Sequence, residues 1–397
     1  MPQHDVVVIG GGPSGLHLAR LLAGRGLDIA VLEKKKNFGD NAICTGIVGR
    51  ETFGEFDLPS GSVTGHLQFV RMVSASGQTI VYKHPEPFAS IVDRRSFDRD
   101  MAEKALAAGA DIEIGTVVRD IRVDPDGVTV EASDRDGRPV RRTARLAVLA
   151  TGHEQRLHKK AGLSAPRKSI FAAQAEVRSE AGGVTTIFIG KSIAPGGFGW
   201  VVPAGPGRIK IGLLTTGDPR AAFDRFIEAQ GRALDPAVFS SPLGIKPIAQ
   251  GMAARSVSDR ALALGEAAGQ VKTTTGGGIY FGLLGARLAA EAILRGYAGG
   301  DFRVATLAEY ERQWKSALRK EIAVGFWARK IYAWLSETQV EALFGLARTD
   351  GIIPLIQKEG KFDWQSGLIV DLIRRTSVFD FFKSLSRKPA ILERILN

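Results

Sequence analysis

Three glycines near the N-terminus have the spacing of a turn that binds a dinucleotide. Gly10, Gly12 and Gly15 follow the apolar run 5–9 and precede a helical pattern. The first glycine permits a tight turn, the second lets the backbone approach a pyrophosphate, and the third lets helix and strand pack closely. Glu33, 18 residues after Gly15, can accept hydrogen bonds from ribose hydroxyls. The combination predicts a dinucleotide site, because a turn that serves only packing would not need the acid.

Two later segments have the composition expected of further contacts to the same cofactor. One is Ala150-Thr151-Gly152 after an apolar run, and the other runs from Gly265-Glu266 to the glycines 276–278 and Ile279. Consecutive glycines before a helix form an anion-accepting nest and leave space for a flat ring. A flexible surface loop is the alternative interpretation. Simple NAD-dependent dehydrogenases do not return distant segments to the cofactor, so we interpret the dinucleotide as FAD.

The element that positions the first glycines is a βαβ unit of about thirty residues. The segments 5–9 and 28–33 each contain a continuous apolar run, at 6–9 and 29–32, as in strands buried on both faces of a parallel sheet. Between them, residues 16–23 are apolar at helical spacing, and Gly24 and Gly26 end the helix. Further along, the pattern predicts a hairpin within 61–84, a helix over 94–108 and a hairpin within 128–150.

The second half of the chain changes from strands to helices. Alternating segments predict strands near 171–177, 185–189 and 208–214, and the chain after about residue 305 is largely helical. The predicted fold class is α/β, with a Rossmann-type FAD-binding domain, a mixed antiparallel-sheet substrate domain and a C-terminal helical region. We assign 1–60, 90–165 and 255–305 to the FAD-binding domain, 61–89 and 166–254 to the substrate domain, and 306–397 to the helical region.

Composition limits the partners and the cellular location. The chain has 397 residues and a formal net charge of +11, which favours anionic partners such as phosphorylated cofactors or lipid headgroups. The positive charges are scattered, so we expect no nucleic-acid binding. There is one cysteine, no secretory signal, no uninterrupted apolar run long enough for a spanning helix, and no histidine or cysteine pair at metal-ligand spacing. We therefore expect a cytoplasmic protein without a metal site.

Several motifs together resemble the para-hydroxybenzoate hydroxylase-type flavoproteins and, within them, the geranylgeranyl reductase family. The resemblance covers roughly residues 5–300. It depends on GGGPSG at 10–15, Glu33, the cysteine loop 41–47, VDRRSFD at 92–98, PGGFGWVVP at 195–203, and GEAAG to GGGI over 265–279. The cysteine loop and the PGGFGWVVP stretch are the most specific to the family.

The glycine turn and the segment after the apolar run 146–150 predict cofactor contacts at Gly10, Gly12, Gly15 and Gly152. The resemblance implies further FAD contacts at Ser14, Glu33, Cys44, Thr45, Ile47, Arg94, Val118, Glu266, Gly278 and Ile279. Two departures concern this set. The family has Gly-Asp where this chain has Gly265-Glu266, and the loop after Cys44 reads Thr-Gly-Ile instead of a small, glycine-rich run. The first departure alters the geometry at the ribityl hydroxyls, and the second reshapes the pocket above the flavin.

Cys44 and Tyr280 are the candidate catalytic residues. By resemblance, Cys44 faces the flavin and the reacting double bond, where it relays a proton or steers the substrate; a small buried hydrophobe is the alternative. Tyr280 follows the glycine nest and is a second candidate proton donor. Phe198 and Trp200 alternate on a strand, so both can point into one substrate pocket, with core packing as the alternative for each.

The resemblance implies a reductase that saturates carbon–carbon double bonds of a polyprenyl chain by hydride transfer from reduced flavin. The partners implied are an isoprenoid lipid substrate and an external electron donor, either NAD(P)H or a ferredoxin-type carrier. The alternatives are a flavin monooxygenase or halogenase of the same fold, and a non-catalytic prenyl-binding protein. The basic, partly apolar segments 368–375 and 379–396 fit either a peripheral contact with the inner face of the membrane or helices that cover the substrate domain.

Overall fold

The structure is a computed structural model that describes residues 3–40, 42–179, 183–230, 242–349, 352–375, 378, 380 and 381. The N-terminal βαβ unit has the bounds that the apolar pattern predicts: β1 (His4–Ile9), α1 (Pro13–Ala23) and β2 (Ile29–Glu33). Pro13 stands at the start of α1, where its missing N–H costs no hydrogen bond, and Gly24 caps the other end. Both strands are buried because helices cover the sheet they enter.

The first sheet carries this unit at its centre, in the order β17-β18-β11-β1-β2-β8, with β9 and β10 continuing from β11. Strand β1 is parallel to β2 and to β11, and β11 is parallel to β18. The chain therefore leaves β1, β2, β11 and β18 at the same edge of the sheet. The other strands are β8 (Asp111–Ile114), β9 (Val117–Asp124), β10 (Gly127–Ser133), β11 (Pro139–Leu149), β17 (Val257–Ser258) and β18 (Ala261–Ala263).

Helices from three parts of the chain accompany this sheet, and α1 packs against both others. They are α1, α3 (Arg94–Ala107) and α5 (Ile279–Gly299). Asp93 caps α3 by accepting a hydrogen bond from the Ser96 N–H at 2.9 Å. The buried core here includes Val7, Phe97 and Phe281.

A second sheet has the order β16-β12-β15-β14-β13-β5-β6 and is mostly antiparallel. Its strands are β5 (Phe69–Ser74), β6 (Thr79–Lys83), β12 (Ser169–Arg178), β13 (Thr185–Ile189), β14 (Phe198–Pro203), β15 (Arg208–Thr215) and β16 (Gly244–Ala249). Helix α4 (Pro219–Gln230) covers one face. A third, small sheet has the strand order β3 (Ile47–Gly49), β7 (Ala89–Val92) and β4 (Val63–Leu67). Helix α2 (Arg50–Glu55) follows β3 directly.

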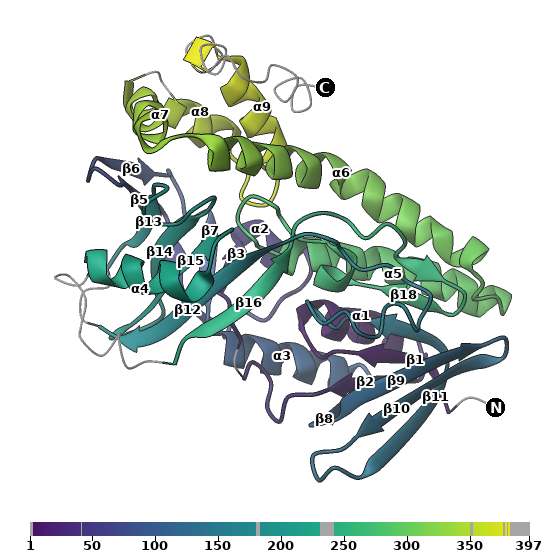
Figure 1. Ribbon diagram of the computed structural model, residues 1–397. Coiled ribbons are helices and arrows are strands. Elements are labelled where there is room, and N and C mark those ends of the chain that lie inside the picture. Colours follow the sequence, from purple (N-terminus) through teal and green to yellow (C-terminus); the bar gives the residue numbers. More distant parts are fainter. Residues whose placement is uncertain are drawn as a thin grey trace.

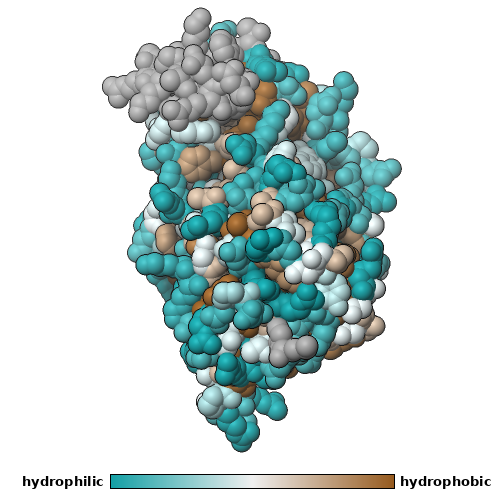
Figure 2. All heavy atoms as spheres, turned by 90° about the vertical axis from the view of Figure 1, so that its right-hand side faces the viewer, coloured by the Kyte–Doolittle hydropathy of each residue, from teal (hydrophilic) through white to brown (hydrophobic). Residues whose placement is uncertain are grey.

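The C-terminal part is helical, as predicted. Helix α6 (Val304–Trp334) packs on α5 and extends past the first sheet to the second, where α7 (Glu337–Thr349), α8 (Ile352–Glu359) and α9 (Ser366–Arg374) gather (Figure 1). On the face drawn in Figure 2, hydrophilic residues predominate and hydrophobic ones are scattered. The predicted segment 379–396 falls almost entirely outside the described residues.

The α/β fold class is confirmed, and the predicted strands and hairpins are present. One element was not predicted: helix α4 follows the strand segment 208–214, because 219–230 has apolar residues at helical spacing that bury Phe223 and Phe226 against the sheet. The division into an FAD-binding domain and a substrate domain stays a proposal, and the two large sheets support it.

Candidate active site

The glycine turn lies where β1 ends, and the three glycines differ in their surroundings. Gly10 has a φ of 113°, and a Cβ there would lie 2.4 Å from the Ala150 carbonyl oxygen. A Cβ at Gly15 would lie 2.2 Å from the Gly10 carbonyl oxygen. A Cβ at Gly12 would meet nothing within 4 Å. Gly10 and Gly15 are thus required by the fold itself, whereas Gly12 borders open space at the N-terminus of α1.

Glu33 is buried beside this turn and organises it. One carboxylate oxygen accepts the Gly11 N–H at 2.6 Å and the other accepts the Lys35 N–H at 2.8 Å. The sequence pattern did not reveal these contacts. Each carboxylate oxygen has a second lone pair, so Glu33 retains the capacity to accept hydrogen bonds from ribose hydroxyls.

A cavity of about 420 Å³ opens next to the turn, within the range usual for ligand sites. It extends from the carboxyl edge of the first sheet to the second sheet and the cysteine loop. The predicted residues that line it are Gly12, Ser14, Gly15, Cys44, Thr45, Ile47, Arg94, Gly152, Phe198, Trp200, Glu266, Gly278, Ile279 and Tyr280. Residues from distant parts of the chain therefore meet in one pocket. Gly10, Glu33 and Val118 lie outside the lining, and buried Val118 accepts Arg156 Nη2 through its carbonyl at 2.6 Å.

The wall formed by the second sheet is apolar. Phe198 and Trp200 both line the cavity, with ring centroids 5.9 Å apart. A Cβ at Gly212, opposite Trp200 on β15, would lie 2.6 Å from the Trp200 ring, so the glycine makes room for the indole. Other apolar side chains of the second sheet complete this wall: Val70, Ile187, Val202, Leu214 and Ile248. Leu67, Phe88 and Phe362 extend the apolar lining from other elements.

Glu266 and Lys246 are charged residues in the lining of the cavity. Glu266 lies on the short 3-10 helix η2 (Gly265–Ala268), and its Oε2 is 3.6 Å from Lys246 Nζ. Its Oε1 is buried and has no hydrogen-bond partner in the described part of the chain. An orphaned buried carboxylate oxygen is costly unless a ligand donates to it. This oxygen can accept a hydrogen bond from a group that carries hydroxyls, such as the ribityl chain of FAD. The glutamate at position 266 is therefore compatible with FAD, although the family has aspartate there.

Cys44 is half-buried on the loop before β3 and is surrounded by donors. The Gly46 N–H donates to Sγ at 3.4 Å, and Gln174 Nε2 donates to the Cys44 carbonyl at 3.3 Å. Burial by itself raises the pKa of the thiol. Arg94, Lys246, the Gly46 N–H and Lys210 outweigh burial and hold the pKa below its ordinary value.

Tyr280 lies at the start of α5, and its hydroxyl has two partners. It donates to Glu55 Oε2 at 3.0 Å and accepts from Trp364 Nε1 at 3.3 Å. Burial, with a contribution from Glu55, raises the pKa of Tyr280 to about 12. The hydroxyl is therefore a weak acid whose proton is engaged with Glu55.

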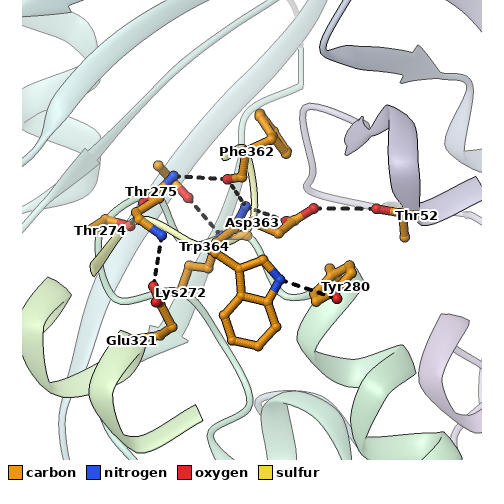
Figure 3. A network of polar contacts seen from close by, with 11 residues as sticks. Thr52, Lys272, Thr274, Thr275, Tyr280, Glu321, Phe362, Asp363 and Trp364 are labelled. Atoms are coloured by element: carbon orange, nitrogen blue, oxygen red, sulfur yellow. Dashed lines mark hydrogen bonds and ion pairs between the residues drawn. The ribbon is translucent and has the colours of Figure 1, made fainter. Parts of the chain in front are cut away.

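A segment of the C-terminal region, residues 360–365, closes one side of the cavity; we call it the strap. It joins α8 to α9 and places Phe362 and Asp363 in the lining. Asp363 accepts Lys272 Nζ at 2.7 Å and the Thr52 hydroxyl at 3.3 Å (Figure 3). The Lys272 ammonium also lies 4.3 Å from the centroid of the Phe362 ring.

The strap continues into α9 through a further set of hydrogen bonds. The Glu321 carboxylate on α6 accepts the Gln365 N–H at 2.8 Å and the Ser366 N–H at 2.9 Å, which caps α9. Trp364 Nε1 donates to the Tyr280 hydroxyl at 3.3 Å, which joins the strap to the start of α5 (Figure 3). Sequence reasoning missed the strap, because no spacing relates residue 272 to residue 363.

Comparisons with known proteins agree with this architecture. A family model for FAD dependent oxidoreductases matches residues 5–76. Digeranylgeranylglycerophospholipid reductase 1 of Methanothermobacter thermautotrophicus is 30% identical over 357 residues, covering 85% of this chain and 89% of the relative. Digeranylgeranylglycerophospholipid reductase 2 of Methanopyrus kandleri is 27% identical and covers 98% of each chain.

Solved structures share the fold at lower identity. A geranylgeranyl bacteriochlorophyll reductase-like protein from Thermoplasma acidophilum has a TM-score of 0.81 at 21% identity, covering 96% of this chain and 98% of its own. A flavin-dependent brominase has a TM-score of 0.68 at 17% identity, covering 96% and 98%. The identity and coverage of the archaeal reductases, together with the FAD-dependent oxidoreductase match, place this chain in the geranylgeranyl reductase family of FAD-dependent oxidoreductases.

Proposed function

We propose that this enzyme saturates carbon–carbon double bonds in the geranylgeranyl chains of a glycerophospholipid, with reduced FAD as the reductant. The observation that carries the proposal is the cavity, in which the carboxyl edge of the first sheet, where we place the cofactor, continues into the apolar wall of the second. An apolar wall suits a hydrocarbon chain and excludes water from the reacting carbons. The names of the archaeal relatives supply the kind of lipid.

The same residues that were predicted from the sequence would hold FAD. Gly12, Ser14 and the N-terminus of α1 would bind the pyrophosphate, Glu33 the adenosine ribose, and Glu266 the ribityl hydroxyls. Thr45, Ile47 and the glycines before α5 would border the flat ring. When bound and reduced, FAD supplies the hydride.

The chain's own contribution is orientation and a proton. Phe198 and Trp200 would hold the alkene against the ring, and the Cys44 thiol would give its proton to the carbon that does not receive hydride. Tyr280 lines the same cavity and stays a second candidate donor, although a pKa of about 12 makes it a weaker acid than the thiol.

The proposal also includes a source of electrons and a route by which the lipid enters. An external donor, either NAD(P)H or a ferredoxin-type carrier, would reduce the flavin. No helix among the described residues is long and apolar enough to cross a membrane. The net charge of +11 supports a peripheral contact with acidic lipid, from which a lipid substrate would enter. Helix α9 buries Val370 and Ile373 against Val324 of α6, so its amphipathic pattern is explained by packing and does not add to this support.

The other two functions have less support. The brominase shares the fold alone, and Phe198 stands where a halogenase-like W-x-W motif would have its first tryptophan. A non-catalytic prenyl-binding protein would need neither the buried Glu33 beside the glycine turn nor an acid at position 266.

Anaerobic turnover tests the proposal. The FAD-loaded protein is reduced with dithionite, freed of excess reductant and mixed with a digeranylgeranylglycerophospholipid. We expect flavin reoxidation without oxygen and a lipid that gains two hydrogens for each flavin reoxidised, measured by absorbance and mass spectrometry. The fully saturated lipid serves as the control and should leave the flavin reduced.

Two results would contradict the proposal. If unsaturated prenyl lipids with different headgroups all leave the flavin reduced, and it reoxidises only after air enters, a monooxygenase would be favoured. Tight lipid binding with no reoxidation under any condition would favour the carrier.

A further inference from the structure

Lys210 is a buried cation that the proposed reaction leaves without a role. It lies on β15 and is 5% exposed. Its register partner on β14 is Val202, which lines the cavity, so both side chains are on the cavity-facing side of the sheet. Its Nζ donates to the Thr45 carbonyl at 3.2 Å. That acceptor is neutral, and among the described residues no carboxylate lies within ion-pair distance of this ammonium.

Three cations from three elements influence the Cys44 thiol: Arg94 from α3, Lys246 from β16 and Lys210 from β15. Arg94 forms an ion pair with Asp98 at 2.8 Å, and Lys246 forms one with Glu266 at 3.6 Å. Asp98 and Glu266 therefore offset part of the positive charge of Arg94 and of Lys246.

Asp93 is a further carboxylate near Lys210, and it is occupied in capping α3. Lys210 therefore supplies the positive charge near Cys44 that no ion pair in the described structure offsets. A buried ammonium without a carboxylate is costly. A thiolate that forms on Cys44 during the reaction would supply the negative charge that Lys210 lacks.

We infer that Lys210 is the positioning residue for Cys44: its ammonium holds the 44–46 loop through the Thr45 carbonyl and stabilises the Cys44 thiolate. The role of that thiolate in turnover depends on the proposed function. In the protonation step the S–H bond breaks and a C–H bond forms at one alkene carbon, while the other carbon takes the hydride. The S–H electron pair stays on sulfur, and the thiolate next to Lys210 later takes a proton from water.

The chemistry requires such a partner because a thiol is a poor acid at its ordinary pKa. An acid works best when its pKa lies near the operating pH. A neighbouring cation moves the thiol in that direction, since it favours the charged form. Lys210 also gains, because its own pKa is lowered by burial and partly restored by the Cys44 charge.

The chain has one cysteine, so the ionisation of Cys44 can be measured without interference. The rate of alkylation by iodoacetamide is followed against pH in the oxidised FAD-loaded protein by mass spectrometry. Arg94 and Lys246 lower the pKa of Cys44 more than Lys210 does, and both stay in place when Lys210 is replaced. We therefore expect the midpoint to rise in Lys210→Met by about one unit at most, the low end of the effect of a neighbouring cation. It should stay near the wild-type value in Lys210→Arg and unchanged in Lys160→Met, which removes a surface cation paired with Asp120.

Equal midpoints in wild type and Lys210→Met would overturn the inference, and so would an equal rise in Lys210→Met and Lys210→Arg, which would indicate shape instead of charge. If Lys210→Met loses FAD or its circular-dichroism spectrum, Lys210→Gln gives the same comparison with a side chain that still donates to Thr45. Alkylation requires no lipid. A midpoint shift in a protein that reduces no prenyl lipid would therefore count against the proposed function alone, and lipid reduction without a shift would count against Lys210 alone.

Discussion

Replacing Gly12 with alanine should give a folded protein that no longer retains FAD. Gly12 has a φ of −80° and a ψ of 174°, which alanine adopts freely, and its added Cβ would meet no protein atom within 4 Å. The fold therefore tolerates the change. The Cβ would instead occupy the space in front of the first N–H groups of α1, where the pyrophosphate is expected. Overpacking costs about 3 kcal/mol at its upper range, or roughly a hundredfold in affinity.

Two other glycines make this experiment specific. Gly54→Ala adds a Cβ in α2 that also meets nothing within 4 Å, but this residue is absent from the cavity lining, so FAD binding should not change. Gly15→Ala forces a Cβ to 2.2 Å from the Gly10 carbonyl oxygen and should destabilise the fold itself. The flavin-to-protein absorbance ratio and circular dichroism separate the three outcomes. A Gly12→Ala protein with wild-type FAD content would show that the pyrophosphate does not lie at this turn.

Local patterns predicted the elements whose residues carry their own signal. The continuous apolar runs of β1 and β2 require burial on both faces, and the glycines between them allow only a tight turn, so the βαβ unit followed from the sequence. Helix α4 was missed because it lies between strands of the second sheet. Its amphipathic pattern becomes decisive only when Phe223 and Phe226 have a sheet face on which to pack.

The same distinction applies to the site. Phe198 and Trp200 were placed in one pocket because alternate residues of a strand share a face, whichever sheet the strand enters. Lys210 is also two residues from Gly212 on one strand, yet nothing in the sequence indicates that this lysine is buried or that it faces the Cys44 loop. Such contacts depend on how the second sheet and the cysteine loop approach each other, which is tertiary information.

The strap gives the second large effect that we expect. Asp363→Ala should release residues 360–365 from the cavity, because it leaves the Lys272 ammonium without its carboxylate. The side chains of Lys272 and Asp363 are 7% and 10% exposed, so solvent replaces little of what is lost. Breaking a buried ion pair on one side costs about 3–5 kcal/mol. The Thr52 hydroxyl loses an acceptor in the same change.

Tryptic cleavage after Lys361 measures this release: the Lys361 side chain is exposed, but a protease needs a segment that is free to leave its packed conformation. Cleavage follows the population of the open form, so a loss of about 3 kcal/mol should accelerate it roughly a hundredfold. Asp301→Ala removes an exposed ion pair with Arg303 and should leave the cleavage rate nearly unchanged.

A double variant separates the missing charge from the missing shape. Removing both partners of a buried pair avoids the orphaned charge, so Lys272→Met combined with Asp363→Ala should recover much of the wild-type resistance. Wild-type cleavage in Asp363→Ala alone would mean that the Glu321 cap of α9 holds the strap and that the Lys272–Asp363 pair contributes little. The rescue in the double variant, together with rapid cleavage in the single one, would identify this ion pair as the contact that joins the C-terminal helices to the cavity wall.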